Sequence, residues 1–143
     1  MALMHRPIPL VYRLVALLLL AAFLSGCASI DERKKADLLN RTTRQYERAI
    51  RWGDYGDASA FIKQTGTMAV APNPEGLKQF RVTSYETQST VLNEDDTEAQ
   101  VVVQIKYYNE NRMQVETLTD RQTWKYEADP GVWYLDSPLP AFH

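Results

Sequence analysis

The sequence predicts an α+β domain in which one long helix packs on a curved four-stranded antiparallel sheet. Two hydrophobic periods carry this prediction. Around Leu39, Tyr46 and Ile50, apolar side chains recur every three or four residues, as on one face of an amphipathic helix. From Phe80 onward the period falls to two, which is typical of strands that bury one face. Because the helical part comes first and the strands follow in series, the order favours an α+β fold.

The long helix is expected over residues 30–52. Ser29 and Glu32 have the spacing of a capping box, which would satisfy backbone N–H groups at the helix start. Gly53 follows the last residue of the pattern, and glycine is favoured there because it adopts a left-handed conformation without strain.

A second, short helix is expected over residues 58–63. Asp54 or Asp57 precedes it, and either can act as its N-cap. Gly66 and two prolines interrupt residues 65–75, which predicts a loop before the first strand.

Four strands are expected in residues 80–136, and the clearest runs from Ala99 to Tyr107, where apolar and polar residues alternate. The strands on either side of it change phase once, after Val82 and after Val115. One extra residue in a strand reverses its phase, so we expect a β-bulge at each change, and bulges bend a sheet. Turn residues are found at 93–96, 109–111 and 129–131, and the last strand is expected over 132–136.

The first 27 residues have the layout of a secretory signal peptide. The apolar run at residues 14–24 is too short to span a bilayer as a helix, which takes about 20 residues. Arg6 and Arg13 precede the run, and the small residues Ser25 and Gly26 follow it. A charged start, a short apolar segment and a small-residue cleavage region are typical of such signals.

The end of this segment, Leu24-Ser25-Gly26-Cys27, resembles the lipobox of bacterial lipoproteins. The resemblance implies that the Cys27 thiol carries a diacylglycerol, that the chain is cut between Gly26 and Cys27, and that the new amine is acylated, for instance with palmitate. The alternative is a cleaved secretory signal, or an uncleaved anchor, with an unmodified cysteine. On the lipoprotein interpretation, the chain consists of a cleaved signal (1–26), a lipidated cysteine with a short tether (27–29) and one periplasmic domain (30–143).

Composition narrows the function classes. Removal of residues 1–26 leaves 143 − 26 = 117 residues, the size of one domain. Lys and Arg fall from 16 to 14 against 18 acids, a net charge of 14 − 18 = −4, which is not the charge of a nucleic-acid-binding domain. Cys27 is the only cysteine and His5 and His143 are the only histidines, so thiol, histidine and zinc chemistry lack their usual residues. We therefore expect no metal, no cofactor and no nucleic-acid partner.

Two segments resemble NTF2-like, or more loosely cystatin-like, α+β folds. One is the helix end Tyr46–Tyr55, which closes in a Gly-Asp-aromatic step, and the other is the final hairpin Trp124–Trp133. NTF2-like folds often hold a cavity between helix and sheet, so the resemblance implies room for a small apolar ligand. The alternative is an ordinary aromatic core, since aromatics at these periods usually carry buried area. The candidate cavity residues are Tyr46, Trp52, Phe80, Tyr107, Trp124 and Trp133.

Catalysis is not expected. NTF2-like isomerases and dehydratases typically use an aspartate with a histidine or tyrosine, and this fold region contains no such histidine. Glu86, Glu116 and Asp120 fall in strands, where only a carboxylate that faces the cavity could act as a base. The acids at 94–98 crowd a turn, where solvated side chains are the ordinary expectation.

The basic residues Arg33 to Lys35 follow the proposed anchor closely. Through Arg51 the helix region carries seven basic and four acidic residues, whereas the rest of the mature chain carries seven against fourteen. These cations can approach an anionic membrane surface. The alternative is an ordinary solvated helix face.

The sequence therefore predicts a non-enzymatic lipoprotein of the bacterial envelope that acts as a protein-interaction or assembly module. Ala28 follows the cysteine in place of aspartate, so the lipoprotein resemblance favours the periplasmic leaflet of the outer membrane. The expected partners are the membrane, through the anchor, and envelope proteins; Val102 and Tyr108 on the outer sheet face also permit a homodimer. A carrier or sensor of a small apolar ligand is the alternative function, and an isomerase- or hydratase-like enzyme is the third.

Overall fold

The computed structural model describes residues 26–63 and 73–143, with side chains from residue 31. The described part contains α2 (Gly26–Trp52), α3 (Tyr55–Ser59), α4 (Pro74–Leu77), β1 (Phe80–Leu92), β2 (Glu98–Asn109), β3 (Val115–Glu127) and β4 (Val132–Leu135). The strands form one antiparallel sheet in the order β1-β2-β3-β4. The α+β class and the four-stranded meander are therefore confirmed. Residues 1–25, which make up nearly all of the predicted signal peptide, lie outside the described residues.

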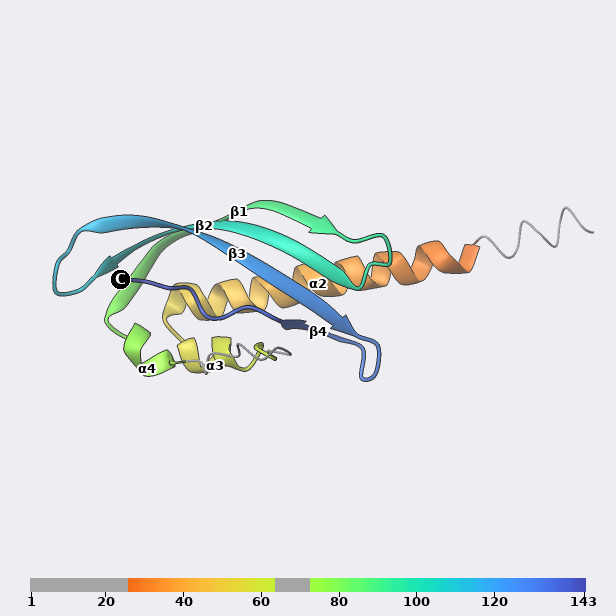
Figure 1. Cartoon of the computed structure of the whole chain (residues 1–143), viewed down its shortest axis with the longest axis horizontal. Coiled ribbons are helices and arrows are strands. Elements are labelled where there is room, and N and C mark those ends of the chain that lie inside the picture. The colour runs from red at the N-terminus through yellow and green to blue at the C-terminus, as the bar shows by residue number, and fades with distance from the viewer. Residues whose placement is uncertain (1–25, 64–72) are drawn as a thin grey trace, which may run out of the picture. The chain divides into compact units, whose positions relative to one another are not determined.

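The chain divides into two compact units, residues 1–35 and residues 36–143. The second unit holds the sheet and the hydrophobic core. In this unit α2 lies along the concave face of the curved sheet (Figure 1). Among the described residues, no helix combines the length and apolarity that crossing a bilayer requires.

Helix α2 begins at Gly26, four residues before the predicted start at residue 30. Ser29 therefore lies inside the helix, and the predicted capping box does not mark its start. No glycine or proline follows Gly26 in this stretch, so nothing in the backbone chemistry interrupts the helix. The predicted end at Gly53 is confirmed: φ is +74°, Gly53 N donates to Ile50 O at 3.2 Å, and Asp54 N donates to Ala49 O at 2.8 Å. These two bonds form a Schellman motif, which satisfies carbonyls at the helix end.

The core fills the space between α2 and the sheet. In β2 alternate residues from Ala99 to Asn109 are buried, which confirms the alternation that predicted this strand. The Tyr46 ring meets the Trp124 ring edge to face, with centroids 5.5 Å apart. From α2, the buried residues are Leu39, Tyr46, Ala49 and Ile50.

The predicted bulges are confirmed in one strand and wrong in the other. The β1–β2 register shifts between Val82 and Ser84, where the sequence changes phase, and shifts again between Thr87 and Ser89, which was not predicted. The β2–β3 register runs from Tyr108–Val115 onward without a shift. The apparent phase change in β3 arises because Val115 points outward, while polar residues occupy several inward positions of this strand.

The short helix differs from its prediction. Helix α3 begins at Tyr55 and ends at Ser59, earlier than the expected 58–63, and the side chain of its N-cap residue Asp54 makes no capping hydrogen bond. The chain after α3 instead runs beside β4: Leu135 N donates to Phe61 O at 2.7 Å and Lys63 N donates to Leu135 O at 3.0 Å. A backbone pairing to the sheet has replaced the helical hydrogen bonds that were expected there.

The C-terminal segment closes one end of the core. Phe142 packs on Tyr107, with ring centroids 4.5 Å apart, and on Phe80 at 5.7 Å. Strand β4 ends at Leu135, one residue before the prediction, and the Ser137 hydroxyl accepts a hydrogen bond from Thr123 N at 2.8 Å. The end of the chain is thereby held on the face of the sheet that α2 covers.

Candidate functional site

Polar side chains occupy the inner face of β3, the face that α2 covers. Residues opposite each other in neighbouring strands share a face. Gln122 lies opposite the buried Val101, Asp120 opposite the buried Val103, and Glu116 opposite Tyr107. The apolar inner face of β2 therefore lies beside an inner face of β3 that carries three polar side chains. This polar stretch is the strongest candidate for a functional site in the core.

Gln122 organises the group. Its side chain is buried, its Nε2 donates to Asp120 Oδ2 at 2.7 Å and to Tyr85 Oη at 2.9 Å, and its Oε1 accepts from Trp124 Nε1 at 3.0 Å. The indole N–H can only donate, so Oε1 must face Trp124 and the amide N–H groups must face the carboxylate and the phenol. One amide thus ties the core indole to both Asp120 and Tyr85.

Asp120 is a half-buried carboxylate without a cationic partner. The six ion pairs of the described residues do not include it. Burial raises the pKa of this carboxyl above its ordinary value, and the hydrogen bond from Gln122 opposes the shift only in part. Lysine or arginine usually neutralises a carboxylate in such a place. Here no lysine or arginine of the described residues pairs with the carboxylate.

Tyr46 brings an unused hydroxyl to the same place from α2. The side chain is fully buried, and within the described part of the chain its Oη has no hydrogen-bond partner. Burial raises the pKa of Tyr46 well above its ordinary value, and the nearby Asp120 and Tyr85 raise it further. A buried hydroxyl without a partner costs about 1–3 kcal/mol, so folded proteins keep few of them.

The group can exchange hydrogen bonds and hold a proton. Asp120 is an acceptor that also binds a proton more readily than a solvated aspartate, and Tyr46 and Tyr85 supply hydroxyl groups. Among residues 31–63 and 73–143, no cluster of three or more histidine, cysteine or acidic side chains could hold a metal ion. The chemistry that these side chains offer is hydrogen bonding and proton binding.

The predicted cavity residues fall into separate groups. Tyr46 packs on Trp124, Phe80 packs on Tyr107 at 5.8 Å, and Trp133 packs on Tyr126 at 5.4 Å; all but Tyr126 are buried. Trp52 joins none of these groups, because its side chain is 81% exposed. It follows the buried Ile50 by two residues, and a helix turns about 200° over that distance. The aromatic residue type suggested burial, but the helical phase decides against it.

The acids named from the sequence take different positions. Glu86 is exposed and accepts a hydrogen bond from Ser84 Oγ at 2.9 Å, and Glu116 accepts one from Tyr107 Oη at 3.2 Å. Only Asp120 combines an inward position with a resolved rise in carboxyl pKa among the described residues. Gln122 could have been found from the sequence, because it lies two residues before the inward-facing Trp124 and alternate residues of a strand share a face. At the proposed lipidation site, Gly26 and Cys27 form the start of α2, and only their backbone is described.

No protein-family model matches this chain, and no curated protein or solved structure matches it significantly.

A matched pair of variants tests whether Tyr46 Oη is unpartnered. Tyr46→Phe removes a hydroxyl that makes no hydrogen bond, so we expect the free energy of unfolding to stay within about 0.5 kcal/mol or to rise. Tyr55→Phe removes a buried hydroxyl that donates to Phe80 O at 3.2 Å, so we expect a loss of about 1 kcal/mol. Urea unfolding of both variants measures the difference. Equal losses would show that Tyr46 Oη has a partner.

Proposed function

We propose that this chain is a membrane-anchored lipoprotein of a bacterial envelope whose α+β domain acts as a non-enzymatic protein-interaction or assembly module. The lipobox resemblance at Leu24–Cys27 supports the anchor. A cysteine with three acyl chains would hold the protein stably at a bilayer, whereas a single chain binds only marginally. The proposed location is the periplasmic leaflet of the outer membrane, because Ala28 rather than aspartate follows the cysteine.

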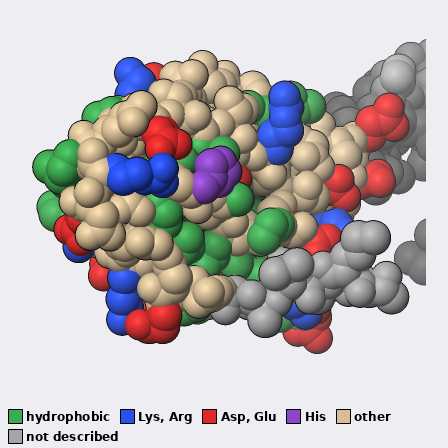
Figure 2. All heavy atoms as spheres, turned by 60° about the vertical axis from the view of Figure 1, so that its left-hand side comes forward, with side chains coloured by type: hydrophobic (Ala, Val, Ile, Leu, Met, Phe, Trp, Pro, Cys, Tyr) green, Lys and Arg blue, Asp and Glu red, His purple; other side chains and the backbone are tan. Residues whose placement is uncertain are grey.

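An exposed apolar spot where β2 turns into β3, beside the outer sheet face, carries the interaction proposal. Met113 is 71% exposed and Val115 is 58% exposed, and Val115 pairs with Tyr108 across the β2–β3 ladder. Helix α2 covers the opposite face of the sheet (Figure 1). Figure 2 views the domain from the end where β2 turns into β3 and shows that hydrophobic side chains reach the surface among charged ones there. The residues of the spot itself are given by their exposure. Exposed apolar groups that lie together are typical of interaction sites.

The partner is an envelope protein or a second copy of the chain. Val102 and Tyr108 belong to this outer face, and a twofold pairing of the face would bury them together. Strand β1 lies at the edge of the sheet and is 13 residues long. An edge strand offers backbone hydrogen-bonding groups to a partner strand, so it extends the surface available to the same partner.

The fold proposed for the domain is NTF2-like or cystatin-like. A long helix on the inner face of a curved antiparallel sheet, with bulges in β1, supports that assignment. So does the helix end at Gly53, which leads directly into α3.

A second candidate function is a carrier or sensor for a small molecule, and the group around Gln122 favours it. The unused Tyr46 Oη and the uncompensated Asp120 carboxylate would bind a ligand that is mainly apolar and carries one polar group. An isomerase- or hydratase-like reaction would use the same carboxylate as its base. A ligand mass that co-purifies with the protein and is lost from Tyr46→Phe would favour this function over the first.

Cys27→Ser tests the anchor. We expect the parent protein in the membrane fraction, with an intact mass that begins at Cys27 and includes the lipid. The serine variant lacks the thiol that receives the diacylglycerol, so it should lose the lipid mass and the lipid-dependent fractionation. Ser29→Ala, beyond the cleavage site, is the control and should keep both. Unchanged lipid labelling and fractionation in Cys27→Ser would refute the lipoprotein assignment.

Crosslinking in intact cells, with pull-down through a C-terminal tag, tests the outer-face spot. Val115→Arg places a charge at its centre and should reduce capture of the partner about tenfold, whether that partner is another protein or a second copy. Val132→Arg, on β4, is the control, because Val132 is also exposed but pairs with Glu127, at the end of β3 far from the β2–β3 turn. Equal capture by parent and Val115→Arg would count against this surface.

A further inference from the structure

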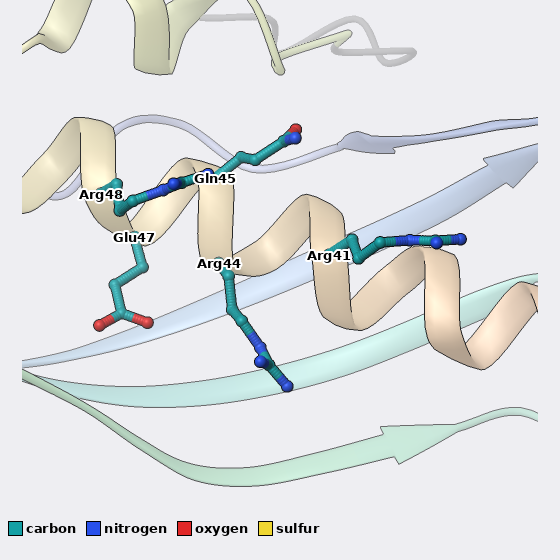
Figure 3. A pocket seen from close by; sticks show the side chains of 5 residues that line it. All are labelled: Arg41, Arg44, Gln45, Glu47 and Arg48. Atoms are coloured by element: carbon teal, nitrogen blue, oxygen red, sulfur yellow. The ribbon is translucent and has the colours of Figure 1, made fainter.

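The outer face of α2, opposite the core, carries a row of arginines. Arg41, Arg44, Arg48 and Arg51 are spaced by three, four and three residues, so they project from one face of the helix. All four are exposed. Three of them line a hollow together with Gln45 and Glu47. In Figure 3 the side chain of Arg44 points away from the helix, whereas those of Arg41 and Arg48 run roughly along it.

Little in the described chain neutralises these arginines. Arg51 pairs with Glu47 at 3.5 Å, and none of the other five ion pairs among the described residues involves a member of the row. The imbalance extends to the whole helix region: residues 27–51 carry seven basic and four acidic side chains, whereas residues 52–143 carry seven and fourteen. The helix region is therefore net cationic, and the rest of the mature chain is net anionic.

Trp52 lies at the end of the row. It follows Arg48 by four residues and Gln45 by seven, which places it on the same side of the helix. Its side chain is 81% exposed, whereas the other two tryptophans of the chain, Trp124 and Trp133, are buried. Tryptophan favours membrane–water interfaces, where the ring contacts apolar chains and the indole N–H stays hydrated.

We propose that the arginine row and Trp52 bind the anionic phospholipid headgroups of the membrane that holds the anchor. Guanidinium groups pair with phosphate in a bidentate manner, and each cation near an anionic surface strengthens binding about fivefold. The anionic remainder of the domain is repelled by the same surface. The charge distribution thus selects one orientation of the domain, with α2 towards the bilayer and the outer sheet face towards partners.

This inference rests on the proposed lipidation, which would hold the arginine row near the membrane surface. Arg41 follows Cys27 by 41 − 27 = 14 residues, and even a fully extended segment of that length spans only about 50 Å. This segment therefore keeps the arginine row close to the headgroups. A contact between the row and the membrane that would be weak for a free domain is strengthened by the high local concentration that the anchor provides.

Acrylamide quenching of tryptophan fluorescence tests the proposal on the native lipidated protein in vesicles. Because Trp52 is the exposed tryptophan, acrylamide mainly quenches Trp52. In vesicles of phosphatidylcholine mixed with phosphatidylglycerol we expect the quenching constant to be at least about twofold lower than in phosphatidylcholine alone. High salt should abolish the difference, because it screens the charges.

Two triple variants complete the experiment. Substitution of Arg41, Arg44 and Arg48 by glutamine should remove the difference between the two vesicle types. Substitution of the exposed Lys106, Arg112 and Arg121 by glutamine removes the same amount of charge from the sheet side. This variant should keep the difference in quenching between the two vesicle types. Equal quenching in both vesicle types, or a difference that survives loss of the helix arginines, would overturn the proposal. Failure to float with neutral vesicles would instead show that the lipid anchor is missing.

Discussion

The junction between α2 and β3 determines how the rest of the domain is arranged. The Tyr46 ring packs edge to face on Trp124, and the Trp124 indole is fixed by Gln122, which also holds Asp120 and Tyr85. This junction sets the rotation of the helix. With Tyr46 and Ile50 turned to the sheet, the arginines and Trp52 necessarily face outward. The buried contact therefore decides which side chains the surface presents.

Two surfaces and one buried polar group of the domain carry different chemistry, and together they suit a protein held at a membrane. The cationic face of α2 is directed to headgroups in the proposed orientation, and the apolar spot at Met113 and Val115 belongs to the opposite side of the sheet. Between them lies the polar group around Gln122, which costs stability because Asp120 has no cation and Tyr46 Oη no partner among the described residues. Proteins tolerate such costs most often at functional sites. This cost in stability supports the second candidate function, a carrier or sensor of a small molecule.

The sequence predicted the architecture because the hydrophobic period is a property of local spacing. The alternation in β2, the glycine stop at Gly53 and the first phase change of β1 all reappear in the structure. Prediction failed where residue type and position disagree. In β3 the inward positions include the polar residues Gln122 and Asp120, so the apolar residues alone gave a false change of phase, which was interpreted as a bulge. Trp52 was expected inside because it is aromatic, and its helical phase places it outside. The Gln122 hydrogen bonds depend on side-chain orientation, which spacing does not encode.

The pH dependence of stability in Asp120→Asn tests the central claim, that an uncompensated carboxylate lies under the helix. An acid whose pKa is higher in the folded chain loses stability as pH rises from its unfolded pKa, about 3.9, through the folded value. The asparagine keeps an acceptor for Gln122 and carries no charge. We predict a higher urea midpoint than the parent at about pH 7.5, with the gain disappearing towards about pH 4, and no such gain in the exposed control Glu94→Gln. A variant that is less stable than the parent at neutral pH would show that the charge is compensated.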